Sequence, residues 1–190
     1  MKLIAAALLS ALMSVGHVAH AASESEANDT PGTAQDLGPY APGASFTVTG
    51  SRTGGDVDFF SFSLTAAGQV SLAVVTTSGF VGADPILGLW TSGGATPLQV
   101  EDTGGANLDN GDDPVIASMY LDAGSYLIGV THFSGDALAT GQVGDFSSSD
   151  PNAWNYNLQV QTTPVPEPET FALFLAGLGT LALMRRRRSS

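Results

Sequence analysis

The sequence predicts an all-β fold, a jelly-roll-like β-sandwich of about eight strands between Ala22 and Thr163. Short segments in which apolar and polar residues alternate recur along this region, as is typical of strands buried on one face. Glycine-containing turns separate them, and no apolar pattern with a helical period persists for three turns. These observations together favour two stacked sheets joined by turns.

Eight segments have the composition and length of strands. In chain order they are 45–50, 57–64, 69–77, 85–91, 96–101, 115–121, 125–131 and 155–162. Residues two apart share one face of a strand, so Phe60, Phe62 and Leu64 are expected to point into the core together. The same spacing recurs at 70–74, 126–130 and 156–160. The stretch from Ser134 to Trp154 shows little periodicity and is expected to be a long mobile loop.

Residues 1–21 have the organisation of a secretory signal peptide. Lys2 precedes an apolar run that extends to about Val15. Ala19 and Ala21 place small residues at −3 and −1 of a cleavage site, so we expect cleavage after Ala21. An uncleaved anchor helix is the alternative, but the run is shorter than the roughly 20 residues that a membrane span needs.

A second apolar stretch, residues 171–184, lies near the C-terminus. Four arginines follow it: Arg185, Arg186, Arg187 and Arg188. As a helix the stretch would measure about 21 Å, less than the roughly 30 Å of a bilayer core, so length alone also allows a buried helix. Pro166 and Pro168 keep the preceding backbone out of a helix or central strand, and arginine stems can reach a membrane surface. We therefore expect a short transmembrane helix with its arginines in the cytoplasm.

The C-terminal features occur in the order of a known sorting signal. A short motif comes first, formed by Val165, Pro166, Glu167 and Pro168, and the apolar stretch and the arginine cluster follow. Residues 164–190 thereby resemble the PEP-CTERM sorting signal of Gram-negative bacteria. The resemblance implies delivery by the secretion machinery, transient anchoring in the inner membrane through the C-terminal helix alone, and recognition by an exosortase, a membrane-embedded cysteine transpeptidase. It implies a final place at the cell surface or in the extracellular matrix, commonly in organisms that make exopolysaccharide.

The region between the terminal segments is strongly acidic. Of the 18 acidic residues, 17 lie between Ala22 and Pro168, where Arg52 is the only basic residue. This charge would repel nucleic acid, and it favours divalent cations or neutral surfaces as partners. The chain has no cysteine, so no disulfide ties the fold together, and a bound metal is the natural substitute in an exported domain.

Two acidic stretches have the chemistry of a calcium site: ESEANDT, after the expected cleavage site, and GGDVDFFSF, at the entrance of a strand. Asp56 and Asp58 have the parity of the core residues that follow them, so their carboxylates lean toward the inner face, where a bare charge is costly. Calcium takes about 6–8 oxygen ligands and tolerates irregular geometry.

The spacing of the first stretch limits this interpretation. In an extended chain Glu24 and Asn28 would lie about 13 Å apart, so the segment must curl or hold two ions. The alternative is that ESEANDT is a flexible terminus and that the aspartates of the second stretch only cap turns.

Three motifs make residues 23–131 similar to the bacterial pre-peptidase C-terminal domain: ESEANDT with TAQDLG, GGDVDFFSF and LDAGSYLIGV. That family is a small jelly-roll sandwich found beside secreted proteases and in collagen-binding modules, where calcium ties the N-terminal segment to the sandwich. The ligands that the resemblance implies, position by position, are Glu24, Glu26, Asn28, Asp29, Asp56 and Asp58. Ala27 stands where the family usually has proline, which leaves these ligands intact but loosens the linker.

The sequence argues against catalysis. His132 is the only histidine of the body, and neither a cysteine nor a Gly-x-Ser-x-Gly nucleophile elbow is present. We therefore expect a structural or adhesive surface protein stabilised by calcium, and no enzyme. The alternative is a carbohydrate- or protein-binding module whose partner is exopolysaccharide or a surface protein. An exposed aromatic ring would favour that alternative, and Trp154 in DPNAWNYN is the candidate ligand-binding residue.

Overall fold

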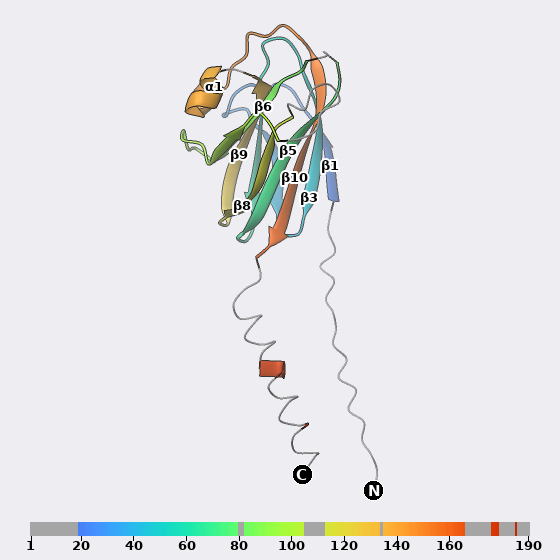
Figure 1. Cartoon of the computed structure of the whole chain (residues 1–190), viewed down its shortest axis with the longest axis vertical. Coiled ribbons are helices and arrows are strands. Elements are labelled where there is room, and N and C mark those ends of the chain that lie inside the picture. The colour runs from blue at the N-terminus through green and yellow to red at the C-terminus, as the bar shows by residue number, and fades with distance from the viewer. Residues whose placement is uncertain are drawn as a thin grey trace.

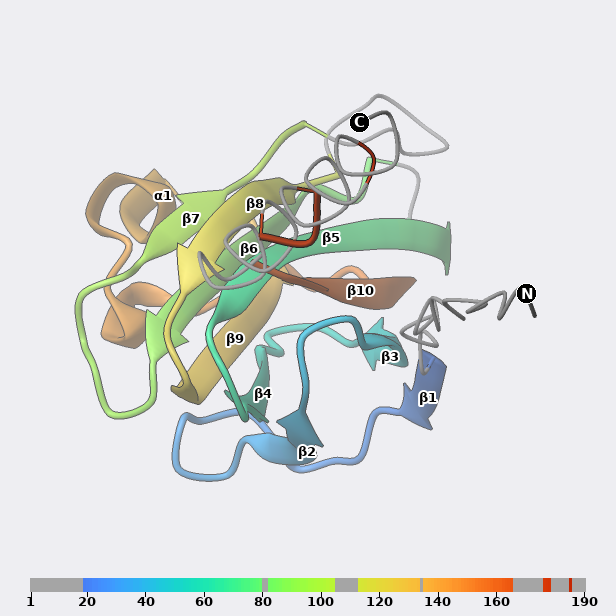
Figure 2. The same ribbon diagram turned by 90° about the horizontal axis from the view of Figure 1, so that it is seen from below.

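The computed structural model describes residues 19–79, 82–104, 113–133, 135–165, 176–178 and 185. Within them, ten strands form two five-stranded sheets that pack against each other (Figures 1 and 2). The strands are β1 (Ala19–Ser23), β2 (Gln35–Tyr40), β3 (Ser45–Arg52), β4 (Asp58–Leu64), β5 (Gly68–Gly79), β6 (Pro85–Thr91), β7 (Gln99–Glu101), β8 (Val115–Leu121), β9 (Gly124–His132) and β10 (Trp154–Pro164). A short helix, α1 (Gly135–Thr140), and a 3-10 turn, η1 (Val143–Asp145), complete the elements. The prediction of an all-β sandwich is confirmed.

The two sheets have the strand orders β1-β3-β10-β5-β8 and β2-β4-β9-β6-β7. Neighbouring strands are antiparallel except at one edge of each sheet, where β1 pairs with β3 and β2 with β4 in parallel. The last strand, β10, occupies the middle of the first sheet and pairs with both β3 and β5. The first sheet therefore depends on contacts between distant parts of the chain.

The sequence predicts about eight strands, and the two additional ones, β1 and β2, lie at sheet edges. All five residues of β1 are exposed, and in β2 only Tyr40 is buried. Neither strand has the apolar alternation that marks a half-buried strand, so pattern reasoning missed both. Strand β1 is held mainly by backbone pairing with β3, whereas β2 pairs with β4 and also anchors Tyr40 in the core, where its ring stacks on Phe46.

The core confirms the predicted inner faces. On β4, Phe60, Phe62 and Leu64 are at most 3% exposed. The inward residues of the other strands join them in one cluster between the sheets; among these are Val70, Leu72, Val74, Ile128, Val130, Tyr156, Leu158 and Val160. Their burial supplies the hydrophobic stabilisation that holds the two sheets together.

The stretch from Ser134 to Trp154, expected to be a loop, contains α1 and η1 and packs on the outer face of the second sheet. There Phe146 contacts Trp90 edge to face, and Phe59 joins them in a second apolar cluster. Strands β4, β6 and β9 are thereby covered on both faces, which explains why β6 is apolar along almost its whole length. A Cβ at Gly88 would lie 2.0 Å from the Trp90 ring, so glycine makes room for this packing.

The beginning of β1 and the end of β10 lie at the same end of the sandwich, because Ala19 and Gln161 both pair with Ser45 of β3 (Figure 1). The predicted cleavage site after Ala21 falls inside β1, and residues 1–18 lie outside the described residues. At the other end of β3, Arg52 pairs with Trp154.

Little of the predicted sorting signal falls within the described residues. Val165 is 38% exposed, and residues 176–178 and Arg185 are helical and exposed. The remaining residues of the signal, which include Pro166, Glu167, Pro168, Arg186, Arg187 and Arg188, lie outside. In the part of the chain that is described, no helix has the length and apolar character needed to cross a membrane.

Candidate metal centre

The segment after β1 bends across the end of the sandwich and is tied to two strands. The Glu24 N–H donates to the Thr49 carbonyl over 2.9 Å, and Glu24 Oε2 accepts from the Ser51 N–H over 2.7 Å. Four residues later, the Asn28 carbonyl accepts from the Phe59 N–H over 3.0 Å. The segment therefore curls between β3 and β4. A common site needs this curl, because in an extended chain Glu24 and Asn28 would lie about 13 Å apart.

Asp56 and Asp58 approach the same place from the start of β4. Asp58 is the first residue of that strand and is fully buried, as its predicted inward parity requires. The Asp56 carboxylate accepts from the N–H groups of Thr53 and Val57 over 3.2 and 3.1 Å. Asp56 thus also caps a turn, as the alternative interpretation expects, whereas the buried Asp58 carboxylate accepts no backbone hydrogen bond among the described residues.

Five carboxylates meet in two overlapping clusters. In one, carboxylate oxygens of Glu24, Glu26 and Asp58 all lie within 4.8 Å of one another. In the other, the same limit holds for oxygens of Glu26, Asp29 and Asp56. Glu26 belongs to both clusters, so the five predicted carboxylates form one continuous group, which we call the acidic cluster.

Asn28, the sixth predicted residue, adds an amide oxygen to the acidic cluster. Its side chain is fully buried, and Nδ2 donates to Glu24 Oε1 over 3.3 Å. Neither Asn28 Oδ1 nor Asp58 Oδ1 has a hydrogen-bond partner within the described residues, although both atoms are buried. Buried oxygens without a donor are costly, so each of these two atoms points to a cation or an ordered water as its partner.

The carboxylates of the acidic cluster perturb one another's protonation. Burial, followed by the charge of Glu24, raises the pKa of Asp58 to about 9. Burial, followed by the charge of Asp56, raises the pKa of Glu26. A hydrogen bond with Asp56, followed by burial, raises the pKa of Asp29. These shifts mean that the folded arrangement favours a proton or a cation among the carboxylates.

Tyr156 is a further member of the site, which sequence reasoning placed only in the core. Its hydroxyl donates to Asp58 Oδ2 over 2.7 Å and lies 3.2 Å from Glu24 Oε1. Burial and these two carboxylates raise the pKa of Tyr156 well above its ordinary value, so it acts as a neutral donor. A Cβ at Gly50 would lie 2.3 Å from the Tyr156 ring, so this glycine admits the ring. The sequence does contain a sign of this role. Tyr156 has the parity of an inward-facing residue on its strand, and a buried hydroxyl needs a hydrogen-bond partner.

The residues present fit calcium better than a softer metal. Carboxylate and amide oxygens are hard ligands, and neither a histidine nor a cysteine belongs to the described cluster. The unpaired oxygens of Asn28 and Asp58 belong to the same donor set. The structure thus brings together all six residues that the sequence proposes as ligands.

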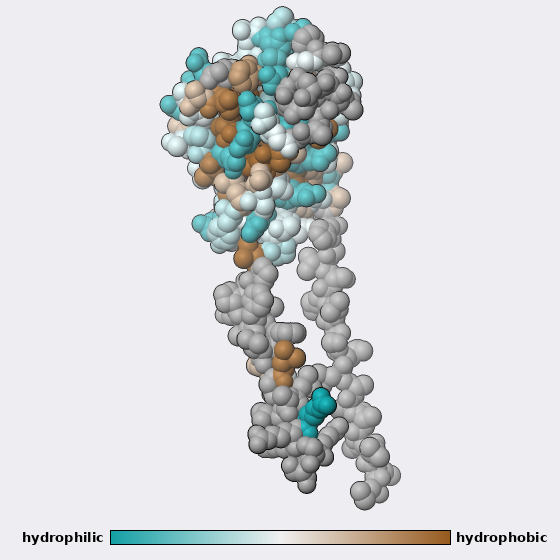
Figure 3. Space-filling model, viewed as in Figure 1, coloured by the Kyte–Doolittle hydropathy of each residue, from teal (hydrophilic) through white to brown (hydrophobic). Residues whose placement is uncertain are grey.

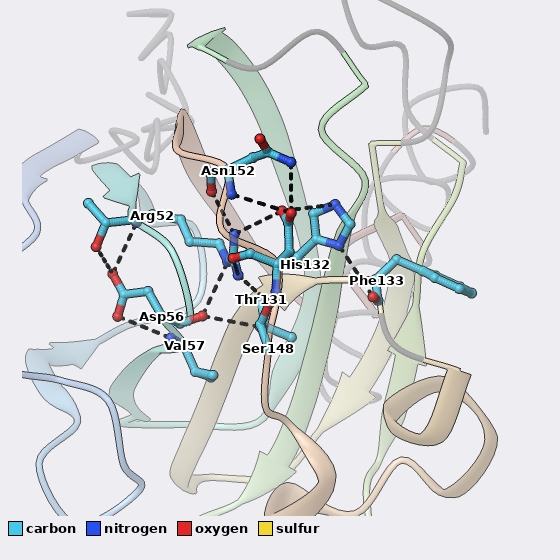
Figure 4. Close-up of polar contacts among 10 residues, drawn as sticks. Arg52, Asp56, Val57, Thr131, His132, Phe133, Ser148 and Asn152 are labelled. Atoms are coloured by element: carbon cyan, nitrogen blue, oxygen red, sulfur yellow. Dashed lines mark hydrogen bonds and ion pairs between the residues drawn. The ribbon is translucent and has the colours of Figure 1, made fainter.

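Arg52 lies beside the acidic cluster but serves a different group of residues (Figure 4). Its fully buried guanidinium donates to Asp150 Oδ2 over 3.4 Å and to the Asn152 carbonyl over 3.0 Å, and also to the Ser148 hydroxyl. His132 Nε2 lies 3.3 Å from the same Asp150 oxygen. We call these five residues the Arg52 cluster.

The Arg52 cluster touches the acidic cluster only through backbone. Arg52 Nε donates to the Asp56 carbonyl over 3.2 Å, and none of its hydrogen bonds in the described chain reaches an acidic-cluster carboxylate. Burial lowers the pKa of Arg52, while the charge of Asp150 opposes this effect. The one basic side chain of the body is therefore committed to Asp150 and to the segment that carries it.

Trp154, the residue predicted to offer a ring to a ligand, lies in the core. It is 1% exposed, and the Arg52 guanidinium carbon lies 5.8 Å from the centroid of its ring. Its parity with Tyr156 on β10 directs it inward, beside that residue. The prediction of an exposed ring at Trp154 is therefore wrong.

Several solved structures are similar to this chain. One is the pre-peptidase C-terminal domain of a collagenase from Bacillus anthracis, with 18% identity, coverage of 67% of this chain and 94% of that one, and a TM-score of 0.46. Another is PliG from Aeromonas hydrophila, a periplasmic inhibitor of g-type lysozyme, with 15% identity, coverage of 78% and 100%, and a TM-score of 0.39. A mutant of the Escherichia coli PliG inhibitor matches at 14% identity, 77% and 99% coverage, and a TM-score of 0.34.

Comparison with curated proteins finds no match. A family model does match the C-terminal region, and its residues agree with the sorting signal that the sequence predicts. The chain carries the PEP-CTERM protein-sorting motif at residues 164–188.

Proposed function

We propose that the chain has a structural or adhesive, non-catalytic role at the surface or in the matrix of a Gram-negative bacterium, and that calcium stabilises it. The sorting motif implies export, transient membrane anchoring before release, and processing by an exosortase. With its β-sandwich body, the chain is thus an exosortase-sorted extracellular protein. The proposed calcium ligands are Glu24, Glu26, Asn28, Asp29, Asp56 and Asp58.

One observation carries the calcium proposal: two buried oxygens lack a hydrogen-bond donor within a group of carboxylates that no basic side chain hydrogen-bonds in the described chain. Asn28 Oδ1 and Asp58 Oδ1 are buried and unpaired within the described residues, next to carboxylates that raise each other's pKa. The extracellular medium supplies calcium, and an ion at this place would satisfy both oxygens and the excess charge.

A bound ion would join the edge of the fold to its centre. Glu24 and Glu26 belong to the segment after β1, while Asp58 belongs to β4 and Asp56 to the turn before it. Because β1 buries no side chain, it has little packing of its own to hold it. Calcium would supply the missing connection, in the place that a disulfide takes in many exported domains.

Thermal unfolding of residues 19–165, which keep all ten strands, tests the proposal with calcium and with a chelator. We expect calcium to raise the Tm by about 5–10 °C when free calcium exceeds its Kd a hundredfold. Glu26→Gln should lose this response because Glu26 belongs to both carboxylate groups. Asp122→Asn removes an exposed charge elsewhere and should keep the response. An unchanged Tm in the unaltered protein would refute the calcium proposal.

The contacts of His132 support a non-catalytic role. Its Nε2 faces Asp150, and its Nδ1 lies 3.3 Å from the Phe133 carbonyl oxygen, so neither nitrogen hydrogen-bonds to a serine among the described residues. A deletion strain of the source bacterium tests the structural role. We expect a less cohesive extracellular matrix that the unaltered gene restores, and an unchanged matrix would count against this role.

A further inference from the structure

A pocket of about 550 Å³ opens beside the Arg52 cluster, within the range of about 300–1,000 Å³ that is typical of ligand sites. Its walls come from three parts of the fold: His132 and Phe133 at the end of β9, Asp136 of α1, and the segment 147–150. None of these residues is a proposed calcium ligand, so the pocket is separate from the acidic cluster.

One wall of the pocket, formed by Ser148 and Asp150, is held in place by the Arg52 cluster. The Asp150 carboxylate accepts from the guanidinium and from the Asn152 side-chain amide, the latter over 2.7 Å. The Gly55 N–H donates to the Asp150 carbonyl over 3.0 Å, which fastens the segment to the turn before β4. Figure 4 shows how these contacts gather around Arg52, while the Phe133 side chain extends away from them. The pocket is thus largely formed before any ligand arrives.

The rim, in contrast, offers polar groups that the protein itself leaves unused. Within the described residues, the side chains of Asp136, Ser147 and Ser149 make no hydrogen bond, and all three residues are exposed. Phe133 is 41% exposed although it is aromatic. Figure 3 shows apolar areas scattered among hydrophilic ones on the face in view. Among the described residues of the sandwich, the other large exposed apolar residues are Leu98, Tyr120 and Leu138.

The charges of the pocket select the class of ligand. Asp150 is already paired with Arg52 and His132, so Asp136 is the one acidic wall residue without a basic partner among the described residues. The acidic body disfavours anions. No group of His132, Asp136 and Asp150 oxygens and nitrogens lies close enough to hold a metal, within the described chain. A neutral ligand rich in hydroxyl groups suits the exposed wall, because its hydroxyls can donate to the Asp136 carboxylate and exchange hydrogen bonds with Ser147 and Ser149.

We infer that this pocket binds a neutral sugar unit of an extracellular polysaccharide. The Phe133 ring would stack on the apolar face of a pyranose, as aromatic rings do on flat C–H surfaces. The Asp136 carboxylate would accept hydrogen bonds from two neighbouring hydroxyls, and Ser147 and Ser149 would donate or accept others. The inference deepens the proposed adhesive role and rests on it, but it does not rest on calcium.

The test uses the full chain in mild detergent and a panel of neutral oligosaccharides built from glucose, galactose or mannose, with acidic glycans as a comparison. Saturation-transfer NMR identifies a binding oligosaccharide, and titration gives its Kd. We expect Phe133→Ala and Asp136→Asn each to weaken binding at least about tenfold, equivalent to about 1.4 kcal/mol. Tyr120→Ala removes an aromatic ring that is 56% exposed on β8 and should leave the Kd unchanged.

The Tm of each variant is measured alongside, and because Phe133 and Asp136 are exposed, we expect it to stay within a few degrees of the unaltered protein. Absence of binding across the panel would overturn the inference while leaving the calcium response intact, so the two proposals fail separately. Binding that survives the double variant, or binding only of acidic glycans in the presence of calcium, would also overturn it.

Discussion

The Arg52 cluster and the acidic cluster lie beside each other in this sandwich, and they stabilise their carboxylates differently. Asp150 faces a guanidinium at 3.4 Å and an imidazole at 3.3 Å. The acidic cluster has five carboxylates and no basic side chain bonded to them in the described chain, and burial raises the pKa of Asp58 to about 9. The carboxylate of the Arg52 cluster thus has a basic side chain as its partner, whereas the carboxylates of the acidic cluster have none in the described chain.

This comparison shows two ways in which a chain with one arginine in its body can stabilise its carboxylates. A guanidinium is rigid and always charged, so it suits a fixed contact between two segments that are distant in sequence. A metal ion can be shared by several carboxylates at once, which one arginine cannot do in the same space. Substitutions, chelation and changes of pH should therefore affect the two clusters differently.

The largest effect is expected from Arg52→Met. The substitution removes the guanidinium donor from the Asp150 carboxylate and from the carbonyl groups around it, so unfolding in urea should show a loss of about 3 kcal/mol. Calcium should not restore the lost stability, because Arg52 contacts the acidic cluster only through the Asp56 carbonyl. A loss below about 1 kcal/mol would mean that the guanidinium is not the main support of this region.

The next largest effect concerns pH in the presence of a chelator. The pKa of Asp58 is raised in the folded protein, to about 9, so between its unfolded value and about 9 the folded state holds the extra proton. Stability should therefore fall as pH rises, by about 2 kcal/mol from about pH 6 to about pH 8. Calcium replaces the proton and should remove this fall. Urea unfolding at several pH values checks the slope, and a rise with pH in chelator would contradict it.

A smaller effect of opposite sign is expected from Asp58→Asn. In chelator the folded protein must take up a proton to neutralise Asp58, whereas the amide is neutral without one, so the variant should be about 1 kcal/mol more stable. The variant should also lose the pH dependence described above and the response to calcium. The matched change Asp122→Asn, at an exposed position, serves as the control. Destabilisation of the Asp58 variant in chelator would show that burial of the Asp58 carboxylate does not destabilise the folded protein.

The smallest effect is expected from Tyr156→Phe, which removes one hydroxyl from the acidic cluster. Asp58 Oδ2 then loses its donor, so stability in chelator should fall by about 0.5 kcal/mol. With calcium bound the loss should be smaller, because the ion also satisfies the carboxylate. Urea unfolding in both conditions measures the difference, and an equal loss in both would separate Tyr156 from the metal site.

Pattern reasoning found the strands whose side chains alternate and missed those whose side chains do not. Strand β4 follows from the spacing of Phe60, Phe62 and Leu64, whereas β1 is exposed along its whole length and leaves no such trace. The six proposed ligands were identified through family resemblance, and the structure brings them together. Tyr156 was missed because its hydroxyl meets Glu24 from 132 residues away.

Local patterns along the chain are enough to predict the export and sorting class and the all-β architecture, because apolar runs, turns and short motifs act locally. They also identify the acidic stretches that form the candidate metal centre. Contacts between distant residues, in contrast, determine which carboxylate shares the positive charge of Arg52 and why Trp154 is covered rather than exposed. These outcomes depend on contacts between β3, β4 and β10, and such long-range pairing is set by packing of the whole sandwich rather than by any local pattern.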